Sequence, residues 1–155
     1  MEIVRTLEAP GPAERLFPYV DDLDAYRRWM PLVHAVTSVE AVGDLPAWDV
    51  ELRATVGPFA RSKRLRMVRT DRVEPELVVF ERAEVDGRAH APWIMRATVV
   101  PDTTADPPSD QVILTMSLHY GGSLWTGAAL QRVLDHGVDR GRRNLVELLS
   151  SEPTH

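Results

Sequence analysis

The chain has 155 residues, a formal net charge of −5, 44% hydrophobic residues and no cysteine. This length predicts a single domain over residues 1–155 that can bury its own core. The lack of cysteine excludes disulfides, thiolate metal sites and cysteine nucleophiles, and the negative charge argues against nucleic acid as a partner. Without a signal-peptide pattern or an apolar run of membrane-spanning length, we expect a cytoplasmic protein that is not integral to a membrane.

The N-terminal elements are predicted to be a short strand and two short helices. The strand covers residues 2–8 and ends at the turn residues that follow. Pro12 is suited to the first position of a helix, because the N–H that proline lacks has no partner there in any case. Asp21 or Asp22 can cap a second helix, which ends near Pro31.

From residue 32 to residue 120 the hydrophobic pattern has a period of two, which is typical of half-buried strands. The alternation is clearest over residues 48–56. Because the connections are too short for crossover helices, we expect six antiparallel strands here. Turns are expected at Gly57-Pro58 and Glu74-Pro75, and a hairpin at Asp86-Gly87 after a strand over residues 76–85.

A long helix is predicted to begin at a Ser123 cap and to extend to about Leu149. The fold class is therefore α+β, with a bent antiparallel sheet of about seven strands against a C-terminal helix. Gly127, Gly137 and Gly141 lie inside this helix. Either they let the helix approach the sheet closely, or they leave room for a ligand between the two.

Few residues favour catalytic chemistry. The five histidines do not pair at the spacing of a helical metal site, so we expect no metal and no cofactor. The acidic run at residues 21–24 is best explained by helix capping. The basic run at residues 61–72 predicts a solvated strand face, with contact to an anionic lipid, a phosphate-bearing ligand or nucleic acid as the alternative. Lys63 is the only lysine and hence the only candidate for Schiff-base chemistry.

The inward faces of the strands carry apolar and methionine side chains, with Tyr120 as a polar group. Methionine suits an irregular apolar site. Arg82 and Arg96 are the charged residues most suited to reach inward from mid-strand. Pockets form readily where a curved sheet meets a helix, so we expect a cavity lined by Trp48, Val50, Leu52, Met67, Arg82, Trp93, Met95, Arg96, Leu114, Met116, Tyr120, Leu130 and Leu134.

Three segments resemble polyketide cyclase/dehydrase-type proteins of the START-like (Bet v 1-like, SRPBCC) superfamily: residues 9–31, residues 56–59 and residues 118–124. The resemblance implies a helix-grip fold, in which the sheet wraps around the C-terminal helix. It also implies binding or carriage of a hydrophobic small molecule, such as a lipid or a polyketide-like compound.

Two other functions stay open. One is an aromatase/cyclase enzyme that uses polar groups such as Tyr120, or Arg82 with a histidine, in the same cavity. The other is a protein-interaction module. The iron-binding pattern of oxygenase members of the superfamily is not evident, and the sequence leaves a homodimer open.

Overall fold

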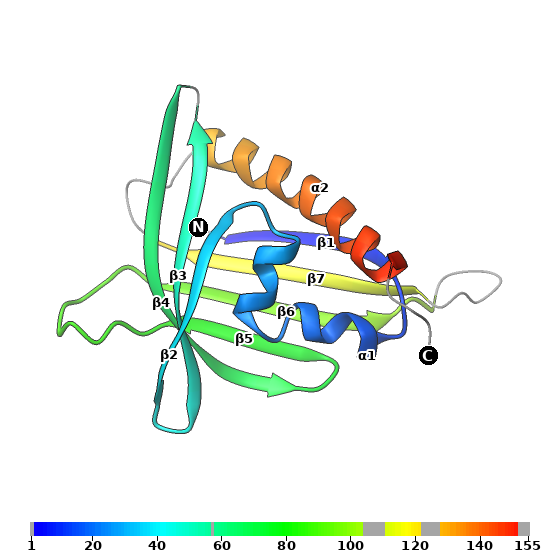
Figure 1. Ribbon diagram of the computed structural model, residues 1–155, viewed down its shortest axis with the longest axis horizontal. Coiled ribbons are helices and arrows are strands. Elements are labelled where there is room, and N and C mark those ends of the chain that lie inside the picture. The colour runs from blue at the N-terminus through cyan, green and yellow to red at the C-terminus, as the bar shows by residue number, and fades with distance from the viewer. Residues whose placement is uncertain (1, 57, 104–110, 122–127, 152–155) are drawn as a thin grey trace.

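A computed structural model describes residues 2–56, 58–103, 111–121 and 128–151 of the chain (Figure 1). Within helix and strands, the side chains of Val56, Phe59, residues 128–131 and Leu134 are outside this description. The elements are, in order, β1 (Glu2–Pro10), α1 (Ala13–Leu16), η1 (Phe17–Tyr19), η2 (Leu23–Arg28), β2 (Val33–Val42), β3 (Leu45–Val56), β4 (Phe59–Val73), β5 (Leu77–Arg82), β6 (Trp93–Pro101), β7 (Gln111–Tyr120) and α2 (Ala128–Ser151).

The strands form one seven-stranded sheet in the order β1-β7-β6-β5-β4-β3-β2, and every neighbouring pair is antiparallel. Strands β2 to β7 follow one another as a meander, and β1 closes against β7. Helix α2 lies across the hollow side of the curled sheet, with the short helices beside it (Figure 1). The predicted α+β fold is confirmed.

The short helical elements are tighter than the sequence predicts. Of the three short elements, α1 is an α-helix, and η1 and η2 are 3-10 helices. Pro12 is the N-cap of α1 rather than its first residue. The Asp22 side chain accepts a hydrogen bond of 2.9 Å from the N–H of Asp24, so the predicted cap of the second helix is confirmed. Pro18 stands in the first turn of η1, where a missing N–H costs least.

The connection between β5 and β6 differs from the predicted tight hairpin. Strand β5 ends at Arg82 rather than near residue 85, and β6 begins at Trp93. The chain from 83 to 92 forms a long loop, in which Gly87 has a positive φ of 74° that favours glycine. Side-chain bonds within this loop, described below, replace the backbone ladder of a hairpin.

Helix α2 is anchored most firmly at its C-terminal half. Leu145 and Leu149 are buried there, and Asn144 donates from its side chain to the carbonyl of Trp29 (3.1 Å). Its two glycines, Gly137 and Gly141, let the helix approach the segment before β2 closely, and they do not face the sheet. A Cβ at Gly141 would lie 3.2 Å from the Trp29 carbonyl oxygen. The predicted Ser123 cap and Gly127 are outside the described residues.

The filled part of the interior lies where α1, η1 and the C-terminal half of α2 cover the sheet. An aromatic cluster lies next to it. Phe80 packs edge-on against Tyr26 and Trp48, with ring centroids 6.4 and 5.7 Å apart. The fully buried side chains of this region include Leu16, Phe17, Val20, Tyr26, Trp29, Val78, Phe80, Leu114, Leu145 and Leu149.

Candidate functional site

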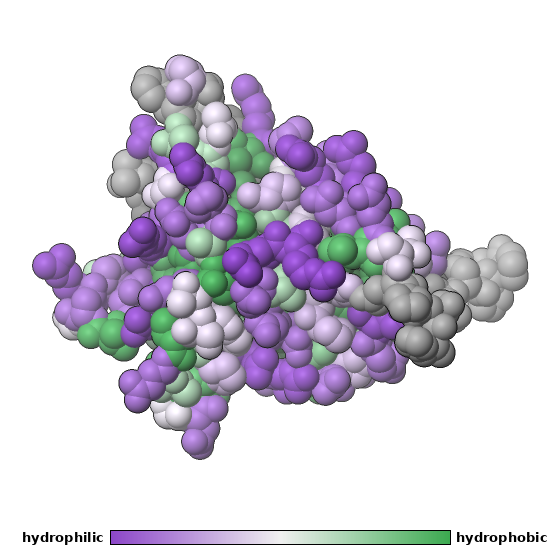
Figure 2. All heavy atoms as spheres, in the orientation of Figure 1, coloured by the Kyte–Doolittle hydropathy of each residue, from purple (hydrophilic) through white to green (hydrophobic). Residues whose placement is uncertain are grey.

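A cavity of about 150 Å³ lies between the hollow face of the sheet and a roof formed by η2, the segment before β2 and α2. Figure 2 shows hydrophobic side chains between the β2–β3 region and α2, framed by hydrophilic ones. The lining presents apolar atoms to this space. The residues that line it are Ile3, Arg5, Leu7, Leu23, Tyr26, Met30, Leu32, Val33, Val50, Leu52, Leu65, Met67, Trp93, Met95, Met116, Ser117, Leu118 and Val138.

Strand alternation supplies most of the pocket wall, because every second residue of a strand faces the same side. The three strand methionines that the sequence singles out, Met67, Met95 and Met116, all line the pocket. So do Val50, Leu52 and Trp93, which were also predicted. Methionine is flexible and polarisable, and this lining can adapt to ligands of different shape.

Two polar residues of the lining, Arg5 and Tyr26, are bonded to groups outside it. Arg5 donates from Nε to the Asp135 carboxylate on α2 (3.0 Å) and from Nη1 to the carbonyl of Val4. Tyr26 donates its hydroxyl to the carbonyl of Val20 at 2.8 Å. Burial, and secondarily the charge of Asp21, raise the pKa of Tyr26 far above its ordinary value, so this phenol is neutral at physiological pH.

Five of the predicted pocket residues lie elsewhere. Trp48 and Leu114 are buried in the filled core, and the ring of Tyr120 packs 5.3 Å from that of Trp93. Arg96 is exposed between two inward-facing neighbours, and so it points away from the pocket. Arg82 lies at the end of β5. Leu130 and Leu134 belong to α2, but their side chains are outside the described part of the chain.

Sequence reasoning missed the roof and the first strand. Tyr26, Met30 and Leu32 belong to helical or irregular segments, for which a period of two carries no information. Leu65 and Leu118 could have been found, because each lies two residues from a predicted methionine on the same strand face. Arg5 carried no signal: a charged residue in an edge strand is expected to face water.

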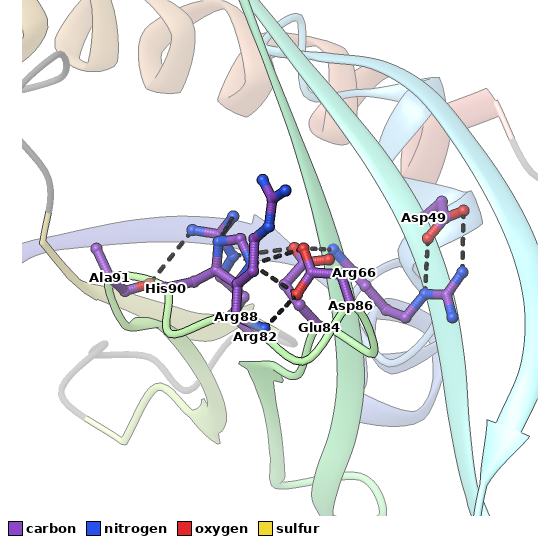
Figure 3. A network of polar contacts seen from close by, with 8 residues as sticks. All are labelled: Asp49, Arg66, Arg82, Glu84, Asp86, Arg88, His90 and Ala91. Atoms are coloured by element: carbon purple, nitrogen blue, oxygen red, sulfur yellow. Dashed lines mark hydrogen bonds and ion pairs between the residues drawn. The ribbon is translucent and has the colours of Figure 1, made fainter.

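A polar network lies beside the pocket, in the loop after β5 (Figure 3). Arg82 donates to Glu84 (3.0 Å) and to Nδ1 of His90 (3.3 Å). Because a guanidinium only donates, the His90 proton is placed on Nε2, 2.9 Å from Asp86. The hydrogen bond from the N–H of Arg88, and next that from His90, hold the pKa of Asp86 below its usual value. This network orders the loop, and its residues are not part of the pocket lining.

Several residues of the charged runs have structural partners. Arg66 pairs with Asp49, and Arg72 with Asp21, both at 3.0 Å. Asp24 pairs with Arg27. His119 is exposed, as expected for a residue on a solvated face. In the ranges that the structure describes, no three histidine or acidic side chains come together as a metal site, and no helix is long and apolar enough to cross a bilayer.

A curled antiparallel sheet gripping a C-terminal helix, with an apolar pocket between them, defines a START-like fold. The chain belongs to the polyketide cyclase/dehydrase and lipid transport family, whose model matches residues 1–150. The resemblance inferred from the sequence is therefore confirmed. No curated protein matches the chain in sequence.

Solved structures share this fold. A START superfamily protein from Mycobacterium smegmatis is 16% identical, with a TM-score of 0.68 over 96% of this chain and 97% of that one. A protein from Thermus thermophilus is also 16% identical, with a TM-score of 0.70 over 98% and 100%. The di-domain ARO/CYC protein StfQ of the steffimycin biosynthetic pathway is 13% identical, with a TM-score of 0.65; the match covers 96% of this chain and 50% of StfQ. At these identities the likeness concerns the fold alone.

Proposed function

We propose that this protein binds or carries a hydrophobic small molecule in the pocket between the sheet and α2. The observation that carries the proposal is the lining: an apolar space of about 150 Å³ bounded mostly by aliphatic and methionine side chains. A cavity of about this volume is large enough for a benzene-sized group. The pocket would thus hold one ring or a short stretch of chain, and the rest of a larger ligand would extend through its open side. The ligand would gain affinity mainly from buried apolar area.

An aromatase/cyclase function is less well supported. Such chemistry needs at least two titratable groups that converge on the substrate. Among the described lining residues, the titratable side chains are Arg5 and Tyr26. The first is paired with Asp135 and the second is bonded to a backbone carbonyl. Arg82 and His90 do lie within hydrogen-bonding distance of each other, but outside the lining.

The test is to fill the pocket and to measure binding of a neutral apolar dye. N-phenylnaphthylamine fluoresces on entering an apolar site and should show a saturable titration with the full chain. Val138→Trp places a large ring in the pocket from α2 and should weaken dye binding by about tenfold or more, since an overfilled site cannot admit the probe.

The matched control is Val146→Trp, a change of the same size in the same helix at a half-buried position outside the lining. It should leave dye affinity within about twofold of the wild type. A dye titration that does not saturate, or equal affinities for Val138→Trp and the wild type, would overturn the proposal. Native mass spectrometry of the purified protein should also detect a co-purifying apolar compound.

A further inference from the structure

We propose that Lys63 binds the anionic head group of the pocket's ligand, so that the ligand is an amphipathic carboxylate rather than a fully neutral hydrocarbon. The inference rests on the proposed function, because it names the chemical class of molecule that the same pocket would take. It is carried by the position of Lys63, by its lack of a hydrogen bond or ion pair in the described part of the chain and by the charges around it.

The position of Lys63 on β4 places it at the edge of the pocket. Residues two apart in a strand face the same side, and Leu65 lines the pocket. Lys63 lies directly opposite Leu52 of β3, which also belongs to the lining. Its amine lies 5.5 Å from the ring centroid of Trp93, a third lining residue. Lys63 therefore neighbours pocket residues on three strands, and its ammonium group lies over the ring of one of them, Trp93.

Lys63 has no anionic partner in the described part of the chain, where it makes no hydrogen bond or ion pair. The nearby carboxylate of Glu84 is already engaged. Its Oε1 accepts from Nε of Arg82 and from the N–H of Arg66, both at 3.0 Å (Figure 3). The charges that act on Lys63 are those of Arg82 and Glu84, and the Glu84 carboxylate is bonded to Arg82 and not to Lys63.

Five other basic residues lie on the same strand, and Lys63 differs from them because it is half-buried without a hydrogen bond or ion pair to the described residues, whereas Arg61 is exposed. Arg66 and Arg72 are paired with Asp49 and Asp21, and Arg69 donates to the carbonyl of Asp21. Arg64 is exposed and lies opposite Glu51 in the register. Burial, and then the charge of Arg82, lower the pKa of Lys63, which means that its charged form lacks stabilisation. A carboxylate held at the pocket edge would supply that stabilisation while the apolar part of the ligand occupies the pocket.

The experiment compares two ligands with the same chain, octanoate and octanol, as competitors of N-phenylnaphthylamine. Lys63→Met removes the charge and keeps an apolar stem; it should raise the octanoate concentration needed for half-displacement by about tenfold and leave octanol unchanged. Lys63→Arg keeps the charge and should retain octanoate binding. Arg64→Met makes a similar charge change one residue away on the opposite face, and should alter neither ligand by more than about twofold.

The possible results separate this inference from the proposed function. If the dye does not bind saturably, or if neither competitor displaces it from the wild type, the proposed function fails. If octanol displaces the dye but Lys63→Met leaves octanoate unchanged, the pocket stands and the role of Lys63 is overturned. An equal loss of both ligands in Lys63→Met, or an octanoate loss in Arg64→Met as large as that in Lys63→Met, would also overturn it.

Discussion

Tyr26 joins the roof of the pocket to the filled core. Its hydroxyl donates to the carbonyl of Val20, and its ring packs 5.0 Å from Trp29 and 6.4 Å from Phe80. The side chain is buried and its pKa is raised, first by burial and then by Asp21. The folded protein therefore keeps the phenolic proton at a pH where the unfolded chain begins to lose it.

This shift predicts a loss of stability in alkali. Above the unfolded pKa of about 10, the unfolded state binds fewer protons than the folded state, so the free energy of unfolding falls by about 1.4 kcal/mol per pH unit from this residue. Below that pH the contribution is fully present. Tyr26→Phe lacks the hydroxyl bond and should be less stable than the wild type by about 1 kcal/mol below pH 9.

The difference should vanish near about pH 11, because only the wild type loses stability through Tyr26. Urea unfolding of both proteins from neutral pH to beyond pH 11 measures this. Parallel stability curves for the two proteins would contradict the prediction.

At the scale of elements, the two glycines of α2 meet different neighbours. A Cβ at Gly137 would lie 3.1 Å from the side chain of Leu32, a half-buried residue at the pocket that has room to shift. A Cβ at Gly141 would meet the Trp29 carbonyl oxygen at 3.2 Å, and that carbonyl is held by Asn144. Because this carbonyl already accepts a hydrogen bond from Asn144, it has little freedom to move away from an added Cβ.

The same substitution should consequently have opposite effects at the two positions. Gly137→Ala gains helix propensity and should stabilise the protein by about 0.5–1 kcal/mol. Gly141→Ala gains the same propensity but strains the contact with Trp29, and should destabilise it by about 1 kcal/mol or more. Urea unfolding at neutral pH measures both. If both substitutions changed the free energy of unfolding in the same direction, the contact with Trp29 would not control how closely the helix approaches.

The secondary structure could be predicted well from the sequence where a single periodicity determines which residues are buried. In β3, Trp48, Val50 and Ala54 are buried and alternate with polar residues, so burial and period agree. The loop after β5 was harder, because Asp86-Gly87 signals a turn but not its length. The length depends on bonds that Arg82 makes with Glu84 and His90, which no local pattern contains.

At the scale of the whole molecule, alternation identifies the inward face but not which part of that face is filled. Leu114 and Met116 are inward residues of the same strand, yet Leu114 is 0% exposed in the core and Met116 is half-buried at the pocket. The distinction comes from the covering layer: α1, η1 and the end of α2 cover one region, and a thinner roof covers the other. Six of the thirteen predicted site residues line the pocket for this reason, namely Val50, Leu52, Met67, Trp93, Met95 and Met116.

This uneven interior predicts unequal costs of truncation along β7. Leu114→Ala should lower the free energy of unfolding by about 2–5 kcal/mol, because it opens a cavity in a filled core. Met116→Ala only enlarges an existing space, and should cost about 1 kcal/mol. Urea unfolding of the two variants tests this pair, and dye binding should change only in Met116→Ala. Equal losses of stability would mean that the pocket region is packed as tightly as the core.

The division between a filled core and a pocket on the same strands also bears on how such proteins diverge. Substitutions at Met95, Met116 or Leu118 can reshape the pocket while Leu114, Phe80 and Leu145 continue to hold the sheet and helix together. The shape of the pocket can then drift under mutation without crossing the threshold below which the chain no longer folds. A core that is separate from the pocket allows the fold to persist in structures that are only 13–20% identical to this chain.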